Sequence, residues 1–410
     1  MISWREYGKY FLVTSVYYLA AFALLFTFLY LKENLSLFSN ANFLNWDAGH
    51  YFQIKTNGYD AVNTAFFPLF PFVWKAFNFT PIGIGFLNFV LFMIAVSVLC
   101  AEMKLKLIHT LIVLSVPGLF FMFLPYAEAL FFFCGTIALV GLKRDKLILT
   151  ALGLFLCSLC RPTTFIFIPA ILIVYYVNRD GNWKTFFTKT LVCIFVLLSG
   201  LFVSFMIQKV YTGQWLTFFD SQEKWGNKLG FPTLPLTTWG GDNILRYEST
   251  AVLIGIISGV VILLVLFNKR WKEKFNFPPE VLFSIAYLAG ATAIVILYRG
   301  GLLFSLNRFI YATPFLLMAL GYFLSCFSFT IKQAILVFVG IILFSALFAS
   351  YSHIHNLLCF AVMALIMSGV LLVNNKSRFI ALGSSVALIL VNSIVAYHLV
   401  MRFLLGLWVA

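Results

Sequence analysis

The residues whose types and spacing suit chemistry begin between the first and second long apolar segments, in the stretch NWDAGHYFQIKTNGYDAVNTAFFPLFP (45–71). It holds two carboxylates, Asp47 and Asp60, and one histidine, His50, among many aromatic residues. A carboxylate partly removed from water at a membrane edge gains proton affinity, which suits Asp47 to general base catalysis. One alternative stays open, because this pattern is also typical of a helix start capped by the aspartate. On a helix His50 would share the face of Asp47 and contact a phosphate or an acceptor hydroxyl.

Two more charged residues stand at the borders of apolar segments. Glu128 lies in LPYAEALFFF, where a carboxylate at membrane depth marks a functional site, although it also suits the first turn of a helix. Arg161 lies in CRPTTF, between two apolar runs. Its side chain either extends to the interface without a specific partner or forms a buried pair with Glu128 or an anionic ligand.

Two arginines, Arg299 and Arg308, bracket the segment YRGGLLFSLNRFIYATPF (298–315) near one predicted surface. The planar donor forks of arginine suit a phosphate, and interfacial anchoring is the alternative. The segment FFDSQEKWG (218–226) supplies Gln222 and Trp225, a polar fork beside an aromatic platform. Such a pair suits a sugar or phosphate site. The alternative is that residues 218–226 form a solvent-exposed helix in the loop, which would have the same composition.

The composition places this chemistry in a membrane. Hydrophobic residues make up 62% of the 410 residues and charged residues only 10%, whereas soluble domains contain about 25% charged residues. The formal net charge of +14 comes from basic residues spread singly through short loops, a distribution typical of membrane proteins. We therefore expect no nucleic-acid partner. The seven cysteines fall in or beside apolar segments and indicate neither a disulfide framework nor a zinc site.

Repeated apolar runs predict an all-α polytopic membrane protein of about 11–13 spans in a single domain, 1–410. The first span stays as a span, because it is long and lacks a small-residue cleavage site. Pro68 and Pro71 disfavour a continuous helix, so residues 66–72 are expected to be broken, re-entrant or interfacial. The thirteen predicted segments are 10–31, 82–100, 107–124, 126–142, 147–160, 164–178, 190–210, 250–268, 280–298, 308–326, 331–350, 356–373 and 379–403.

The basic residues also predict the orientation. With a cytoplasmic N-terminus, 17 of the 28 Lys and Arg residues fall in inner loops, most clearly in 143–146 and 268–274. The acidic candidates and two long loops, 32–81 and 211–249, then face outward. Loops of this length in a compact protein are usually functional, and their Trp, Phe and Pro content argues against disorder.

Three motifs together resemble the PIG-V-type mannosyltransferases, which are GT-C membrane glycosyltransferases and have bacterial relatives. W-D-A-G-H-Y (46–51), N-G-Y (57–59) and A-F-F-P-L-F-P (65–71) resemble the first outer loop of that family. Y-A-E-A-L-F (126–131) resembles its Tyr-Ser-Glu-(Ser/Ala)-Leu-Phe signature, and C-R-P-T-T-F (160–165) keeps the arginine of a third motif. The resemblance covers the first 170 residues. Beyond them it continues mainly as topology and as the pattern F-S-x-x-R-F-x-x-x-x-P (304–314).

The resemblance implies a sugar donor linked to a lipid phosphate, typically polyprenyl-phosphate mannose, inversion at the anomeric carbon, and Asp47 as catalytic base. We then expect Arg308, Arg161, Arg299 and His50 on the donor phosphate. Glu128, Asp60, Gln222 and Trp225 are expected on the sugar or acceptor. Neither a nucleotide nor a divalent metal is indicated, so no cofactor is expected. The acceptor is a glycolipid, a glycan or a protein, and the expected location is a bacterial inner membrane with a periplasmic site.

Two other classes explain parts of the same pattern. A flippase or exporter of a lipid-linked saccharide would carry polar residues along the middle of its spans, but here they gather at one face. A non-catalytic subunit that holds another transferase would not need Asp47, Glu128 and Arg308 to converge. The distances between these three side chains therefore distinguish a non-catalytic subunit from a transferase.

Overall fold

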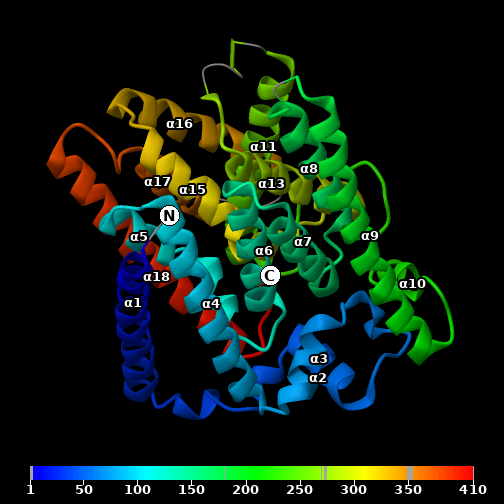
Figure 1. The fold of residues 1–410 in the computed structure, drawn as a ribbon. Helices are drawn as coiled ribbons and strands as arrows, with labels where there is room; N and C mark the ends of the chain where they lie inside the picture. The colour runs from blue at the N-terminus through cyan, green and yellow to red at the C-terminus, as the bar shows by residue number, and fades with distance from the viewer. Residues whose placement is uncertain (1–2, 180, 269, 272–274, 349–353, 410) are drawn as a thin grey trace.

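The structure, a computed structural model, describes residues 3–179, 181–268, 270–271, 275–348 and 354–409. Within these ranges all regular elements are helices, and β-structure is limited to two isolated bridges, 236 to 348 and 237 to 302. The fold is the predicted all-α polytopic membrane bundle (Figure 1). Its α-helices are α1 (Trp4–Leu31), α2 (Asp47–Asn57), α3 (Leu69–Phe77), α4 (Pro81–Met103), α5 (Leu107–Leu114), α6 (Glu128–Lys143), α7 (Leu147–Cys160), α8 (Thr164–Val177), α9 (Trp183–Thr212), α10 (Thr217–Lys224), α11 (Gly241–Phe267), α13 (Pro279–Tyr298), α14 (Leu306–Tyr311), α15 (Pro314–Cys326), α16 (Ile331–Phe344), α17 (Ile354–Leu371) and α18 (Arg378–Leu404). Short 3-10 helices are η1 (Leu35–Leu37), η2 (Asn42–Leu44), η3 (Asn63–Ala65), η4 (Pro117–Phe123) and η5 (Ser345–Leu347).

Each of the thirteen predicted segments is helical over most of its length, but fewer helices are long enough to cross a membrane. Among the described residues six helices are long and apolar enough, or up to seven if the bent pair η4 and α6 is one span. Four further apolar helices, α7, α8, α15 and α16, are shorter; α7, α8 and α16 have 14 residues each. At 1.5 Å per residue such a helix reaches about 21 Å, less than the roughly 30 Å of a bilayer core. Two predicted segments are also interrupted by prolines, Pro117 and Pro314.

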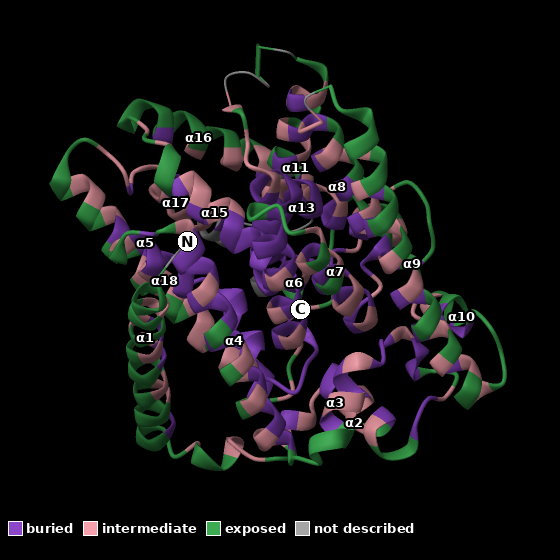
Figure 2. Cartoon of the chain, viewed as in Figure 1, coloured by how far each residue is buried: buried purple, intermediate pink, exposed green. Residues whose placement is uncertain are grey.

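The bundle buries its centre and exposes apolar side chains on its rim. In Figure 2 the buried residues concentrate around α4, α6 and α13, whereas α1 is exposed along much of its length. The apolar residues that α1 exposes include Leu12, Leu19 and Leu24. Exposed leucines along a long apolar helix are what a lipid-facing surface requires, because lipid chains are as apolar as leucine.

The first long loop folds into helices at one end of the bundle (Figure 1). α3 begins immediately after Pro68 and has Pro71 in its first turn, where the missing backbone N–H costs no hydrogen bond. α3 has nine residues and packs against α2, so it does not span the membrane, as the two prolines predicted. Asn78 ends it in the left-handed conformation that asparagine adopts readily (φ 50°).

The second long loop docks on the first through buried hydrogen bonds. Thr64 Oγ1 donates to the carbonyl of Thr217 at 2.9 Å, and Gln208 Nε2 donates to the carbonyl of Thr64 at 2.8 Å. Ser221 Oγ donates to the carbonyl of Val62 at 3.1 Å. These bonds hold α10 and the end of α9 against η3, so the two loops form one layer.

This second loop is shorter than the predicted range 211–249. α11 begins at Gly241, so residues 241–249 belong to a helix and not to the loop. Glu248, predicted as an outer-loop acid, lies inside α11 and has no exposed surface.

The opposite end of the bundle carries a polar cluster that ties the helix ends together. Tyr7 Oη donates to Glu102 Oε1 at 2.8 Å, and Arg144 contacts both residues. Lys143 Nζ lies 3.5 Å from Glu102 Oε2. The start of α1, the end of α4 and the turn between α6 and α7 therefore share one end, away from α2 and α3.

Candidate functional site

A cavity of about 460 Å³ lies at the end of the bundle that holds α2 and α10, and it receives side chains from both long loops. One part of its wall is polar and one part is apolar. The charged and amide members are Asp47, Arg161, Gln222, Asn227, Arg299 and Arg308. The apolar members include Phe66, Phe67, Phe165, Ile166, Phe218, Phe219, Ala291, Ile294, Val295, Phe304, Phe309 and Trp408.

Four charged side chains form a continuous ion-pair network at the polar end. Arg308 Nη1 lies 2.6 Å from Asp47 Oδ2, and Arg308 Nε lies 2.8 Å from Glu128 Oε1. The same Glu128 oxygen accepts a hydrogen bond from Arg161 Nη2 at 2.8 Å. None of the four residues is more than 8% exposed. Arg308 therefore joins Asp47 to Glu128, and Glu128 joins Arg308 to Arg161.

Each member of this network stands at the end of a helix or in a short one. Asp47 is the first residue of α2, and Glu128 is the first residue of α6. Arg161 follows the last residue of α7, and Arg308 lies in the six-residue α14. Asp47 therefore does not cap α2, since the N-cap position is Trp46. Trp46 has φ 57°, an uncommon conformation for a bulky residue, at the point where the chain turns into α2.

Close backbone packing holds this geometry in place. The chain bends by 108° between η4 and α6, and buried Asn88 on α4 donates to the carbonyls of Leu124 and Tyr126 in that bend. Gly118 in η4 faces α14 so closely that a Cβ atom there would lie 2.3 Å from the Cβ of Tyr311. The position of α14, and so of Arg308, depends on these contacts.

The electrostatics of the network favour the charged form of Arg308. Burial alone lowers the pKa of Arg308, but the carboxylates of Asp47 and Glu128 outweigh it and raise that pKa above its usual value. Two carboxylates and two guanidiniums also balance in formal charge. A buried pair tolerates desolvation only when its charges are matched in this way.

Arg299 lines the same cavity but stands apart from the network. Its Nε donates to Asn227 Oδ1 at 3.1 Å, its Nη1 donates to the carbonyl of Phe304, and its guanidinium lies 3.6 Å from the Phe304 ring centre. Burial and the positive charge of Arg308 lower the pKa of Arg299 to about 9, so it remains charged at neutral pH. Within the described ranges no carboxylate lies within 4.0 Å of it, although buried Glu248 is near enough to act on its charge.

Two predicted site residues, His50 and Asp60, belong neither to the network nor to the lining of the cavity. The His50 ring stacks on Phe66 with ring centres 4.9 Å apart and is tilted against Trp225 at 5.4 Å. Asp60 accepts from Gln53 Nε2 at 2.6 Å and from two backbone N–H groups of its own turn. The structure thus gives His50 a packing position beside the cavity and Asp60 a position in a loop turn.

Gln222 and Trp225 both line the cavity, on the side that α10 provides. Gln222 Oε1 accepts from Asn227 Nδ2 at 2.7 Å, and Asn227 in turn accepts from Arg299. These two consecutive hydrogen bonds fix the orientation of the Gln222 and Asn227 amide groups. A ligand in the cavity therefore has access to these amide groups as well as to Asp47 and Arg308.

Several lining residues were not identified from the sequence. Tyr51 lines the cavity, and the ring of Tyr126 lies 5.3 Å from the guanidinium carbon of Arg308; both belong to motifs that carry the family resemblance. Asn227 lies only two residues after Trp225. For Trp408, which follows α18 and reaches the cavity, no local sequence signal exists, because only the fold brings residues 405–409 beside α2.

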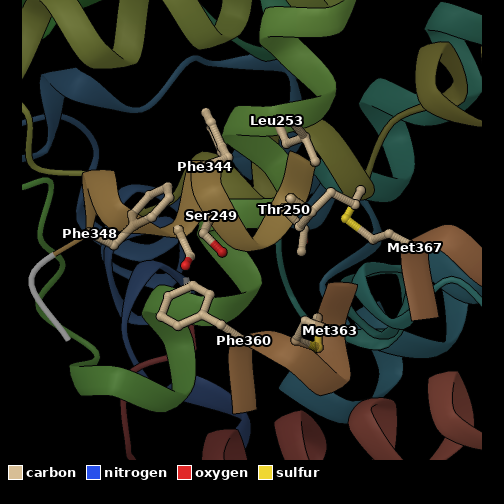
Figure 3. A pocket seen from close by; sticks show the side chains of 10 residues that line it. Ser249, Thr250, Leu253, Phe344, Phe348, Phe360, Met363 and Met367 are labelled. Carbon is tan, nitrogen blue, oxygen red and sulfur yellow. The ribbon is translucent and has the colours of Figure 1, made fainter. Parts of the chain in front are cut away.

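A second, small pocket of about 10 Å³ lies between α11, the end of α16 and α17 (Figure 3). Its walls carry no charged side chain. The side chains labelled in the figure are Ser249, Thr250, Leu253, Phe344, Phe348, Phe360, Met363 and Met367. It is too small for a substrate, and the larger cavity is the candidate functional site.

In the described part of the chain no group of three or more His, Cys, Asp or Glu residues is arranged to hold a metal ion. In comparisons with protein-family models, curated proteins and solved structures, the chain has no significant match to any of them.

Proposed function

We propose that this chain is a membrane glycosyltransferase that moves a sugar, expected to be mannose, from a polyprenyl-phosphate donor to an acceptor hydroxyl with inversion. One observation carries the proposal. A buried carboxylate, Asp47, and three arginines line one cavity together with apolar side chains from two apolar helices, α8 and α13. This combination suits a substrate with an anionic group, a polyhydroxylated group and a long apolar chain.

In this proposal Asp47 acts as the general base. Arg308 Nη1 lies 2.6 Å from Asp47 Oδ2, which leaves the other carboxylate oxygen of this cavity-lining residue to act as the base. That oxygen takes the proton of the acceptor hydroxyl while the hydroxyl oxygen forms a bond to the anomeric carbon. The bond from that carbon to the phosphate oxygen breaks, and its electron pair leaves with the polyprenyl phosphate. Inversion follows because attack and departure occur on opposite faces.

The departing phosphate gains one negative charge, and the arginines differ in how well they can compensate this charge. Arg308 and Arg161 are already paired with Asp47 and Glu128, so much of their charge is compensated. Arg161 retains one buried nitrogen, Nη1, that has no hydrogen-bond partner in the described chain. Arg299 has no carboxylate at ion-pair distance among those residues. We therefore assign the phosphate mainly to Arg299 and to Nη1 of Arg161, where fixed donors stabilise charge at low dielectric.

The apolar part of the cavity suits the chain of the donor. Phe165 and Ile166 on α8, and Ile294 and Val295 on α13, form this part of the wall. Both helices pack in the membrane bundle, so a prenyl chain can lie along them while its phosphate meets the arginines. The sugar then lies between Asp47 and the amides of Gln222 and Asn227.

The test compares Asp47→Asn with wild type and with the matched control Asp60→Asn, which changes the same residue type in the same loop outside the network. Each purified protein in liposomes receives polyprenyl-phosphate mannose and a native lipid extract. We expect Asp47→Asn to lower kcat by about 10²–10⁴-fold, the usual contribution of a general base, with little change in KM for the donor. Asp60→Asn should retain activity.

Two results would contradict this proposal. Full activity of a folded Asp47→Asn protein would remove Asp47 from the base role. No transfer by wild type, although it binds the donor, would instead favour the carrier class, and scrambling of a labelled lipid-linked saccharide in the same liposomes would identify it.

A further inference from the structure

Three tryptophans and one phenylalanine meet near Asp47, and two of these residues, Trp408 and Phe304, line the cavity. Trp46 and Trp408 contact each other edge to face, with ring centres 4.8 Å apart at 85°. Trp239 lies parallel to Phe304, with ring centres 4.0 Å apart at 5°. Trp408 lies 5.9 Å from Trp239 and 6.3 Å from Phe304, so it joins the two pairs into one group, called here the tryptophan cluster.

The tryptophan cluster presents open aromatic surface. Trp46 is 43% exposed and Trp239 is 54% exposed, although both lie at the edge of a cavity in a tightly packed bundle. The guanidinium of Arg299 and the indole of Trp239 are both within 4.0 Å of the Phe304 ring centre, so they must cover opposite faces of that ring. One face of Trp239 is therefore covered by Phe304, and its other face is free for a ligand.

The cluster is held rigidly by hydrogen bonds from three directions. Trp46 Nε1 donates to the carbonyl of Leu407 at 3.3 Å, and Arg402 Nη2 donates to the carbonyls of Trp408, at 3.0 Å, and Gly240, at 3.4 Å. Asn307, next to Arg308, donates to the carbonyl of Val409 at 3.0 Å. Aromatic residues at a membrane interface usually anchor a helix individually. Here residues 405–409 are fixed so that Trp408 faces the cavity.

We propose that the tryptophan cluster is a saccharide-binding subsite for the acceptor, with the free face of Trp239 as its stacking platform; this rests on the proposed glycosyl transfer. The C–H groups on one face of a pyranose ring stack on indole, whose face carries partial negative charge. The position argues for the acceptor because Trp46 directly precedes the base Asp47. The acceptor hydroxyl must reach Asp47 from the open mouth, since α8 and α13 border the donor side.

This placement also limits the kind of acceptor. A rigid platform of three indoles suits a ring with an apolar face and a polar rim, which describes a sugar better than a flexible acyl chain. A saccharide that stacks on Trp239 places its neighbouring hydroxyls toward the amides and carboxylate of the cavity. We therefore expect an acceptor that already carries at least one sugar ring at the mouth.

Direct binding separates this inference from the question of catalysis. Saturation-transfer-difference NMR on the detergent-solubilised protein, without donor, uses mannobiose, N,N′-diacetylchitobiose and lactose as separate probes. We expect transfer to the ring C–H protons of at least one probe with wild type, and at least a fivefold loss with Trp239→Ala. Trp239→Phe, which keeps an aromatic face, should recover most of the signal.

A matched protein makes the result decisive. Trp183→Ala removes a similarly exposed tryptophan that lies outside the cluster and should bind the probe like wild type. The NMR measurement needs neither donor nor turnover, so a failure of the Asp47 base assignment in the transfer assay leaves the subsite standing. The inference is overturned if no probe gives transfer with wild type, or if Trp239→Ala binds as well as wild type.

Discussion

The Arg308 side chain determines much of the site, because a single guanidinium contacts Asp47 and Glu128 at the same time. Removing one member of such a network leaves an uncompensated buried charge, which costs more than the network itself contributes. Asp47 is thus both a candidate base and a counter-ion. A change at this position affects rate and stability together, so each must be measured separately.

Glu128 gives the clearest prediction about stability, because it is 1% exposed and contacts both Arg161 and Arg308. Glu128→Gln should destabilise the protein by about 3–5 kcal/mol, since two buried cations lose a shared partner. The double variant Glu128→Gln/Arg161→Met should recover part of this loss, because it removes one of those cations. Thermal unfolding in detergent measures both effects.

The matched control is Glu223→Gln on α10, where the side chain is exposed. Its unfolding temperature should stay near that of wild type, since exposed charges contribute little. A Glu128→Gln protein as stable as wild type would mean that the two arginines do not depend on this carboxylate.

The sequence identified the residues of the network and offered one of its contacts, the buried pair of Arg161 with Glu128, but not the contacts of Arg308 with Asp47 and Glu128. Asp47, Glu128, Arg161 and Arg308 were all candidates, because charges beside apolar runs are costly and therefore informative. His50 was a candidate because its spacing places it on the Asp47 face of a helix. The structure instead packs its ring on Phe66, since aromatic neighbours decide which part of that face is occupied. Spacing along one helix does not contain this information.

At the scale of helices, the site depends on how closely η4 approaches α14. Gly118→Ala would place a Cβ atom 2.3 Å from Tyr311 Cβ and 3.1 Å from the hydroxyl of Tyr247. We expect a loss of about 1–3 kcal/mol in stability, the usual cost of overpacking, and a larger fractional loss of transfer activity, because α14 carries Arg308. Unfolding temperature and transfer rate are the two measurements.

Gly369→Ala on α17 is the control for this change, because no atom lies within 4 Å of the added methyl group there. That variant should be neutral or slightly more stable, since alanine is the better helix former. If Gly118→Ala behaves in the same way, close packing at η4 does not position α14.

The helices themselves were largely predictable, and their breaks were less so. Proline chemistry correctly predicted that residues 66–72 are not part of a continuous membrane-spanning helix, because the constraint is local. The start of α11 at Gly241 was missed, since residues 241–249 contain polar side chains that are typical of a loop. Glu248 lies in this helix near Ser305 and Arg299, neighbours that only the tertiary fold provides. Tertiary contacts, unlike backbone chemistry, are not visible in a local window.

For the molecule as a whole, the charge distribution predicts which end faces the cytoplasm. The turn 143–146 lies at the end of the bundle opposite to α2 and α10, and basic loops are retained inside. In a Cys326→Ser background, a membrane-impermeant maleimide applied to intact spheroplasts should label Gly230→Cys at least tenfold more than Lys146→Cys. Detergent should make the two equal. The reverse ratio would place the cavity on the cytoplasmic side.

The ion pairs of Arg308 with Asp47 and Glu128 also determine when the site can form during synthesis of the chain. A ribosome adds about 5–20 residues per second, and Asp47 precedes Arg308 by 261 positions, so Asp47 is synthesised tens of seconds before its ion-pair partner. During that interval Glu128 can already pair with Arg161, whereas Asp47 lacks the arginine that contacts it in the finished protein. The chain that precedes Arg308 is thus an intermediate with an incomplete ion-pair network, and an arrest in synthesis before that point leaves a product in which Asp47 has no such partner.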